Sequence, residues 1–487
     1  MPLLTAALIA IPALLIVSVI LSKGASRFGI PALSVFLVIG IIVGKEGVGG
    51  FAFTNYALAQ TLGILALIFI LHAGGLGTPI DDVRSVRASA FVLSTAGVVV
   101  ATVLVGAFAV RFLQFDWLHG LLLGATIAST DVAAVFTVLR SRRISLQSRI
   151  RPLLELESAL NDPMAVFLSV GLLQMLASGS RASFWSLVPM FVKQMTLGTL
   201  AGVAAGNGIR WTLNRVNLEY EGLYPVLSVA LVVGTYGVTD FVGGSGFLAV
   251  YVSGIVLGND DYVNKRSLTL FHDGLAWLMQ IVMFLTMGLL VLPSEVSAVV
   301  QAGVALSAFL VFVARPISVL ACLTPFRYPL REQLMVSWAG LRGAVPIVLA
   351  TYPLIAGVSG ARTIFNLVFF VVFISVLLQG ATIPSVSRWL KVAAPLSRRF
   401  RYPIEYNPTP DEKNQLVEVP VPAGSAAIGK PLVDLGLPIG ALVVLIRRDD
   451  QVHVPRGSTQ IEPNDVLLVL AERDVLDRTR AIVNTRV

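Results

Sequence analysis

The sequence predicts an all-α polytopic membrane protein with a small α+β domain at its C-terminal end. Of its 487 residues, 56% are hydrophobic and only 13% are charged, whereas a soluble globular protein carries about 25% charged residues. The apolar residues form long runs as far as Leu390, and beyond it the composition becomes that of a water-soluble chain. These observations exclude an ordinary soluble enzyme.

About 13 apolar stretches in residues 1–390 are candidate membrane helices, each of which needs about 20 apolar residues. Two of them, 30–44 and 246–257, are short, so we expect them to tilt, to use flanking residues or to be broken. The first lacks the preceding positive charge of a signal peptide, and we interpret it as a permanent span. The stretches are 3–22, 30–44, 57–76, 88–110, 119–139, 152–176, 184–209, 223–241, 246–257, 275–292, 297–324, 333–354 and 363–387.

Basic residues are distributed unevenly between the two sides of these spans. Alternate loops contain 20 Lys and Arg residues, and the remaining loops contain four. Because Lys and Arg accumulate on the cytoplasmic side, this pattern predicts a bacterial inner-membrane protein with its N-terminus outside and its C-terminal domain in the cytoplasm. The net charge of +8 then reflects topology, and the expected partner is the lipid bilayer and not nucleic acid.

The polar C-terminal part begins with a basic, Pro-containing linker over 391–413, followed by a nearly neutral domain over 414–487. A short helix is expected over 428–437, where Gly436 and Pro438 would end it. Alternating apolar residues predict strands at 417–419, 441–446, 452–454 and 466–470, with a hairpin turn at 447–450.

Two adjacent spans, 119–139 and 152–176, hold most of the polar residues inside the membrane. Such residues are costly in lipid and usually mark ion or proton pathways. In the second span, Ser158 and Asp162 share one helix face while Glu157 and Asn161 share the next, so they form one polar stripe. The first span carries Thr126, Ser129, Thr130 and Asp131 near its centre.

Two arginines lie inside other spans and need anionic partners. Arg342 lies among glycines and a proline in span 333–354, which predicts an interrupted helix of the kind that builds ion sites at mid-membrane. Arg315 is the second. The intramembrane carboxylates are Asp131, Glu157 and Asp162. Pairing two acids with two arginines leaves one carboxylate to hold a proton or a metal cation, which is the chemistry of an antiporter; the alternative is pairing that serves only helix assembly.

Four segments of the membrane part carry a specific combination of motifs. They are STDVAAVF (129–136), LLELESALNDPMAVFL (153–168), GGSGFLAVYVSGIVLGN (243–259) and WAGLRGAVPI (338–347). Together they resemble the cation:proton antiporter-1 family of NhaP-type Na+/H+ and K+/H+ exchangers. The resemblance implies an NhaA- or NhaP-like fold with inverted repeats and interrupted helices, and a homodimer in which a mobile bundle moves against a scaffold.

The resemblance also implies roles for the polar stripe. Asp162 is implied to be the carboxylate that binds both the proton and the monovalent cation, beside the neutral Asn161. With one exchanging carboxylate, one proton should trade for one cation, so transport should be electroneutral. The implied cation/proton-binding residues are Asp162, Asp131, Thr130, Ser158 and Asn161, with the metal cation held by Asp162, Asp131, Ser158 and Thr130.

Glu157 is implied to pair with Arg342, and we expect Arg315 to be the other basic member of this structural ion pair. One position departs from the family pattern, because Ala73 stands where many relatives carry an acid before two glycines. The preceding His72 either titrates near neutral pH or is a hydrogen-bonded helix residue, and we favour the second interpretation.

The C-terminal segments PAGSAAIGKPLVDLGLP and RRDDQVHVPRGSTQIEPNDVLLVLA resemble the C-terminal lobe of RCK (TrkA-C) domains. This resemblance implies a ligand-sensing or dimerising module, and a cyclic dinucleotide, another nucleotide or plain dimerisation all fit. No glycine-rich fingerprint precedes it, so no NAD-binding half is expected. The alternative is a tail that only aids folding or oligomerisation.

The predicted function is a monovalent cation/proton antiporter for pH homeostasis, with K+ favoured over Na+ because RCK-like domains accompany potassium transporters. A channel gated by the same domain is the alternative, but no TVGYG-like filter is present. No enzyme and no cofactor are expected beyond the transported K+ or Na+ and H+ and a regulatory nucleotide. The histidines are scattered without HExxH, no GxSxG occurs, and the single Cys322 excludes an intrachain disulfide.

Overall fold

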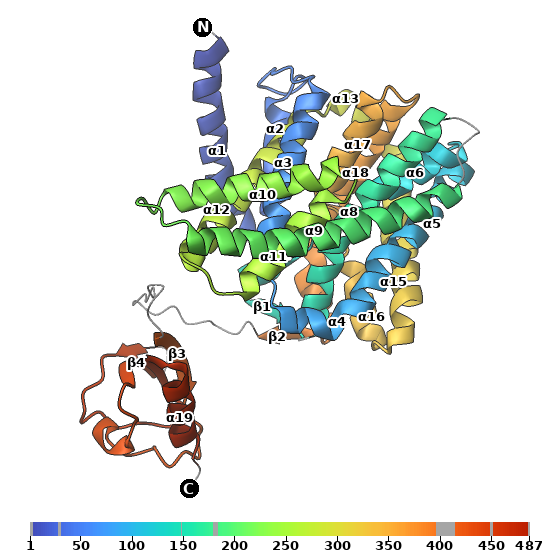
Figure 1. Ribbon diagram of the computed structural model, residues 1–487. Coiled ribbons are helices and arrows are strands. Elements are labelled where there is room, and N and C mark those ends of the chain that lie inside the picture. Colours follow the sequence, from blue (N-terminus) through green and yellow to red (C-terminus); the bar gives the residue numbers. More distant parts are fainter. Residues whose placement is uncertain are drawn as a thin grey trace. The chain divides into compact units, whose positions relative to one another are not determined.

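The computed structural model describes residues 3–27, 31–147, 149–178, 184–395, 414–448 and 451–485. The chain divides into two compact units, Met1–Leu396 and Ser397–Val487, and the first consists mainly of long helices (Figure 1). Among the described residues, nine helices are long and apolar enough to cross a membrane, and four shorter apolar helices accompany them. The predicted helical membrane part with a small strand-containing domain is confirmed.

Six helices of the first unit pack mainly on one another and form what we call the first bundle. They are α2 (Ala32–Val43), α3 (Tyr56–Leu76), α9 (Leu187–Arg215), α10 (Leu223–Phe241), α11 (Gly246–Asn259) and α12 (Lys265–Leu289), with α1 (Leu3–Arg27) packed on α2. The close packing of α3 on α11 requires Gly75, because a Cβ there would lie 3.0 Å from the Cα of Gly254 and would collide with the carbonyl oxygen of Tyr251.

The remaining long helices form the second bundle, and α13 (Pro293–Ala298) links α12 of the first bundle to α14 of the second. The second bundle contains α4 (Ile80–Val92), the π-turn η1 (Leu93–Gly97), α5 (Val98–Phe112), α6 (Trp117–Ile127), α7 (Val132–Ser141), α8 (Ile150–Ser178), α14 (Val300–Phe309), the π-turn η4 (Leu310–Ala314), α15 (Arg315–Leu323), α16 (Leu330–Trp338), α17 (Val345–Ile355) and α18 (Ala361–Trp389). Short 3-10 turns lie at η3 (Phe184–Ser186) and η5 (Thr324–Phe326).

Two predicted spans are interrupted near their centres. Span 119–139 consists of α6 and α7, separated by residues 128–131, and span 333–354 consists of α16 and α17, separated by residues 339–344. The second interruption confirms the prediction from its glycines and proline. The two short predicted spans are continuous helices of 12 and 14 residues, α2 and α11. Helix α12 begins at Lys265, earlier than predicted, because its first turns carry charged residues that a hydropathy window excludes.

Part of the predicted linker belongs to the first unit. Strand β2 (Ala393–Pro395) pairs antiparallel with β1 (Ile144–Leu146), with Ile144 opposite Pro395. The first residues of the predicted linker therefore anchor the end of α18 to the connection between α7 and α8. Residues 396–413 lie outside the described residues.

The second unit is a four-stranded antiparallel sheet in the order β3-β6-β4-β5, with a helix packed on β3 and β6. Its elements are β3 (Asn414–Pro420), the 3-10 turn η6 (Leu432–Leu435), β4 (Leu442–Arg448), β5 (Gln451–His453), β6 (Val466–Glu472) and α19 (Arg473–Asn484). The predicted strands are confirmed, and β4 pairs antiparallel with β5 as in the predicted hairpin, with Ile446 opposite His453. Of the predicted turn at 447–450, Arg447 and Arg448 belong to β4, and residues 449–450 lie outside the described residues. Buried residues of this unit form their own apolar core, which includes Val419, Leu467 and Val469.

Two features of the second unit differ from the sequence-based expectation. The helix predicted over 428–437 is wrong, because Gly429 and Gly436 adopt left-handed backbone angles, with φ of +80° and +62°, and leave only the turn η6. Helix α19 is an additional element. It buries Leu476, Thr479 and Val483 on one face. Because this segment is mostly polar, its few apolar residues give only a weak helical pattern in the sequence.

Candidate ion-binding site

The two interrupted helices cross each other at their unwound segments. The backbone N–H of Asp131 donates to the carbonyl oxygen of Leu341 at 2.7 Å. Gly343 permits this close approach, because a Cβ at that position would lie 2.5 Å from the Cβ of Asp131 and 2.8 Å from its Cγ. The crossing therefore brings together two motifs that are far apart in the sequence.

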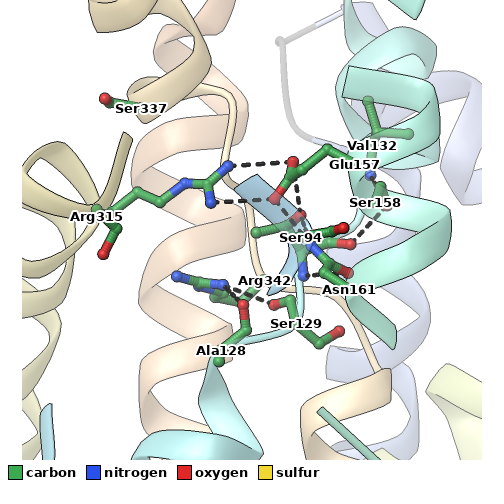
Figure 2. Close-up of polar contacts among 12 residues, drawn as sticks. Ser94, Ala128, Ser129, Val132, Glu157, Ser158, Asn161, Arg315, Ser337 and Arg342 are labelled. Atoms are coloured by element: carbon green, nitrogen blue, oxygen red, sulfur yellow. Dashed lines mark hydrogen bonds and ion pairs between the residues drawn. The ribbon is translucent and has the colours of Figure 1, made fainter. Parts of the chain in front are cut away.

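Arg342 is only 1% exposed, and its guanidinium group binds backbone carbonyls instead of a carboxylate. Its Nη1 donates to the carbonyl oxygens of Ala128 and Ser129, the latter at 2.8 Å (Figure 2). These carbonyls belong to the end of α6, where the interruption removes their helical donors. The backbone N–H of Arg342 donates to the hydroxyl of Ser375 at 2.9 Å. Arg342, in the unwound segment of one interrupted helix, therefore supplies hydrogen bonds to backbone carbonyls that the interruption of the other helix leaves without helical donors.

Glu157 forms its ion pair with Arg315. Nη1 of Arg315 lies 3.1 Å from Oε1 of Glu157, and Nη2 lies 3.2 Å from Oε2, so the pair is bidentate (Figure 2). The side chains of Arg315 and Glu157 are 5% and 1% exposed. The pairing of Glu157 with Arg342 that the resemblance implied is therefore wrong, because the unwound carbonyls of Ala128 and Ser129 take the guanidinium of Arg342.

Asn161 and Ser158 attach the unwound segment 128–131 to helix α8. Nδ2 of Asn161 donates to Oγ1 of Thr130 at 2.6 Å and to Oε1 of Glu157 at 3.1 Å. The hydroxyl of Ser158 donates to the carbonyl oxygen of Thr130 at 2.7 Å and accepts from the N–H of Val132 at 3.3 Å. The side chain of Asn161 is thus engaged in bonds that hold the site together.

Among the described residues, Asp162 and Asp131 are the intramembrane carboxylates of the predicted set that form no ion pair with arginine. Oδ1 of Asp162 accepts a hydrogen bond from the hydroxyl of Ser129 at 2.5 Å. Oδ1 of Asp131 accepts from the N–H of Ala134 at 3.2 Å and caps helix α7. The prediction that charge pairing leaves one acid free is therefore wrong, because Arg342 uses carbonyls and leaves two.

A cleft of about 380 Å³ between the two bundles reaches both acids. Helices α3, α11 and α12 supply the wall that faces α7 and α8. Of the predicted ligands, Asp162, Asp131, Ser158 and Thr130 line the cleft, whereas Asn161 does not. The polar or charged lining residues are Thr78, Thr130, Asp131, Thr137, Arg140, Arg151, Glu155, Ser158, Asp162, Tyr251, Asp273 and Gln280.

Sequence reasoning placed Ser129 near the centre of its span but outside the ligand set, although it is the hydrogen-bond donor to Asp162. The signal that could have found it is its position immediately before Thr130 in a polar segment. The contributions of Tyr251 in α11 and of Asp273 and Gln280 in α12 to the cleft had no comparable signal, because none of them belongs to a cluster of polar residues in the sequence.

His72 lies behind this wall, fully buried within α3. Its Nδ1 lies 3.2 Å from the carbonyl oxygen of Val250, and its ring centroid lies 4.9 Å from that of His272 in an edge-to-face arrangement. The hydroxyl of Ser228 lies 2.7 Å from Nε2 of His272. These contacts support the interpretation of His72 as a hydrogen-bonded helix residue.

Substituting Gly343→Ala should reduce the rate of ion transport at least tenfold while the protein still folds. The reason is that the added methyl group must displace the side chain of Asp131. Overpacking of this kind costs about 1–3 kcal/mol. The matched control is Gly234→Ala in α10, where a Cβ meets nothing within 4 Å. Transport assays on both purified variants check the prediction, which equal activity of the two would contradict.

Comparison with known proteins places these features in a wider set. Residues 13–389 match the family described as "Sodium/hydrogen exchanger, transmembrane", and residues 416–484 match the TrkA-C domain. The K(+)/H(+) antiporter NhaP of Alkalimonas amylolytica is 38% identical over 469 residues, which cover 96% of this chain and 81% of that protein. The K(+)/H(+) antiporter NhaP2 of Shewanella oneidensis is 39% identical over 466 residues, covering 95% and 80%. The Na(+)/H(+) antiporter NhaP of Pseudomonas aeruginosa is 28% identical over 354 residues, covering 68% and 81%.

A solved structure shares the architecture of the first unit. The sodium proton antiporter MjNhaP1 of Methanocaldococcus jannaschii matches with a TM-score of 0.68 at 22% identity, covering 80% of this chain and 99% of that one. At this level of identity the likeness concerns the fold alone. It confirms the predicted NhaP-like fold of the membrane part.

Proposed function

Because the chain belongs to the sodium/hydrogen exchanger family, we propose that it is a monovalent cation/proton antiporter that exchanges K+ for H+ at Asp162 by alternating access. Relatives named as K(+)/H(+) antiporters are 38–39% identical over 95% or more of the chain, which supports K+ as the cation. Na+ is the second candidate, since a more distant relative is named as a Na(+)/H(+) antiporter.

The observation that carries this proposal is the environment of Asp162. Its carboxylate lines a cleft between two helix bundles, accepts one hydrogen bond from Ser129 and, among the described residues, forms no ion pair. A carboxylate held out of water without a fixed counter-ion must take up either a proton or a cation. A group that binds one or the other, and moves between the two sides only when loaded, couples the two flows.

The proposed cation ligands are Asp162, Asp131, Ser158 and Thr130, which all line the cleft. The Ser158 hydroxyl is bonded to the backbone of the unwound segment, so it offers a lone pair already held in place. Asn161 acts in this scheme as a structural neighbour of the site. The buried Glu157–Arg315 pair and the bonds of Arg342 to the interrupted α6 keep the crossing rigid.

The distribution of basic residues in the loops supports the proposed orientation. Arg140 and Arg151 line the cleft and flank β1 in the chain, on the side where Lys and Arg accumulate, which supports a cleft that opens to the cytoplasm. This assignment puts the N-terminus outside and the C-terminal domain inside a bacterial inner membrane. The domains are then an exchanger domain over 1–390, a linker over 391–413 and a TrkA-C domain over 414–487.

The test of function is proton flux in proteoliposomes, titrated with K+, Na+ and Li+ over a range of pH. We expect saturable, cation-dependent proton movement with K+ preferred. With Asp162 as the single exchanging carboxylate, an imposed membrane potential should drive no net charge through the protein. Flux that does not saturate and follows the potential would instead indicate a channel gated by the C-terminal domain.

The TrkA-C domain is proposed to regulate exchange, through a nucleotide or through dimerisation of the chain. Its own apolar core and its own four-stranded sheet support an independently folded module. Deleting the residues after Arg401 should leave exchange intact but shift its dependence on pH or on added nucleotide. The measurement is the same flux assay on full-length and truncated protein, and identical profiles would favour a tail that serves only folding or oligomerisation.

A further inference from the structure

Six residues form a polar cluster at the end of the first unit that lies opposite the cleft. We call it the outer cluster, and it consists of Glu46, Tyr56, Ser294, Glu295, Arg362 and Asn366. Helix α3 runs from the outer cluster toward the cleft. Tyr56 is its first residue, and Thr78, just beyond its last residue, lines the cleft. Its 21 residues span about 30 Å. Figure 1 shows α13, which carries Ser294 and Glu295, at the end of the unit opposite β1 and β2.

The outer cluster connects the first bundle to the second through Arg362. Nε of Arg362, in the first turn of α18, lies 2.6 Å from Oε2 of Glu295 in α13. Its Nη1 donates to the hydroxyl of Tyr56, in the first turn of α3, at 3.0 Å. Nδ2 of Asn366 donates to the same Glu295 oxygen at 3.2 Å. One guanidinium group therefore joins α18 of the second bundle, α3 of the first and the connecting helix α13.

Glu46 makes a second connection to the same helix. It follows α2 of the first bundle, and its carboxylate accepts from both the backbone N–H of Ser294 at 2.8 Å and the hydroxyl of Ser294 at 2.5 Å. Both N–H and hydroxyl belong to the first turn of α13, where backbone donors lack helical partners. Helix α13 is thus held by Glu46 from the first bundle and by Arg362 from the second.

We propose that the outer cluster is a latch, whose residues act as positioning residues for exchange by holding the two bundles together at the outer end while the cleft separates them at the inner end. This inference rests on the proposed function, since alternating access requires the bundles to part at one end at a time. The contacts of Arg362 with Tyr56 must break before Asp162 can be reached from outside.

The contacts of the outer cluster should weaken with added salt and should not change with pH in the physiological range. The charged and titratable groups of the outer cluster and its nearest charged neighbour are Lys45, Glu46, Tyr56, Glu295 and Arg362. Hydrogen bonds from Ser294 hold the pKa of Glu46 below its usual value, and the hydrogen bond from Arg362 does the same for Glu295. Each carboxylate therefore contributes stability above the usual carboxyl pKa and loses it only as the pH falls through its lowered pKa. The Glu295–Arg362 pair is one third to one half exposed, so added salt should weaken it.

The experiment measures which end of the protein is open. In full-length protein carrying Cys322→Ala and Ala276→Cys, which puts a thiol in the cleft wall, a charged, membrane-impermeant maleimide is applied from the cytoplasmic side. Arg362→Met should slow labelling roughly fivefold, because losing contacts of this kind shifts the population away from the inward-open state. Tyr56→Phe, which removes only the acceptor hydroxyl, should slow it less. The matched control is Arg111→Met at the outer end of α5. The guanidinium group of Arg111 lies over the ring of the neighbouring Phe112, so this substitution should leave the labelling rate unchanged.

The result is independent of whether the chain transports K+, since labelling reports accessibility alone and flux is measured separately on the same vesicles. Salt should slow labelling of the parent protein and leave Arg362→Met unaffected, which a merely structural role of Arg362 would not produce. Equal labelling rates for the parent, Arg362→Met and Tyr56→Phe, all eluting as folded protein, would overturn the latch.

Discussion

Replacing Asp162 with Asn is expected to reduce K+-dependent proton flux to the level of protein-free vesicles. The amide can neither release a proton nor offer a full negative charge to a cation, so it removes both halves of the exchange. It retains an oxygen that can accept the hydrogen bond from Ser129, so the variant should fold. The loss is therefore expected to lie in the transport chemistry and not in the structure.

The measurement is dye-reported proton movement in proteoliposomes on addition of K+, with elution in size-exclusion chromatography as a check of folding. A matched control is Asp81→Asn, which removes a carboxylate that is 88% exposed in the first turn of α4. It should leave the flux close to that of the parent. Residual exchange by Asp162→Asn that saturates with K+ would contradict the assignment. Asp131, which also lines the cleft and forms no ion pair with arginine among the described residues, would then be the candidate.

Removing one partner of the buried pair between Arg315 and Glu157 is expected to produce the largest loss of stability. Both side chains are nearly inaccessible, and an uncompensated buried charge costs about 3–5 kcal/mol. Arg315→Met should therefore lower the free energy of unfolding by about that amount. The substitution would also leave the position of the Glu157 side chain less fixed. The carboxylate of Glu157 accepts a hydrogen bond from Asn161 and thereby supports the unwound segment.

The double variant Arg315→Met, Glu157→Gln separates the charge from the packing. It leaves no uncompensated charge, and glutamine keeps an oxygen for the amide of Asn161, so the double variant should be more stable than Arg315→Met alone. Unfolding in detergent micelles, followed by intrinsic tryptophan fluorescence, provides the free energies for this comparison. Equal stability of Arg315→Met and the parent would show that the pair contributes little.

The residues of the candidate site could be found largely from the sequence, because polar residues stand out in a chain whose spans are mostly apolar. Asp162 and Ser158 stand on one helix face within the polar stripe of a mostly apolar span, and only a few residue types can serve a cation there. The glycines and proline around Arg342 likewise predict the interruption that the structure contains. Neither inference needed any knowledge of which helices are neighbours.

The choice of partners could not be predicted in the same way. Arg315 and Arg342 are equivalent by charge, and both are buried. Only the packing decides that Arg315 meets Glu157 while Arg342 meets the carbonyls of Ala128 and Ser129. Those carbonyls are hydrogen-bond acceptors that no side-chain motif announces, because they become available only where the helix is interrupted. The count of unpaired acids changed from one to two for this reason.

The predominantly apolar chain by itself determined the class of protein, the positions of its spans, the uneven distribution of basic residues and the acids that stand inside the membrane. These properties follow from transfer energies, which each segment carries independently of its neighbours. Only the tertiary structure decided that the unwound segments cross at Gly343, that the cleft lies between two bundles and that the outer cluster ties those bundles together. Such contacts join residues distant in the chain, and their partners are selected by packing geometry, which local sequence does not specify.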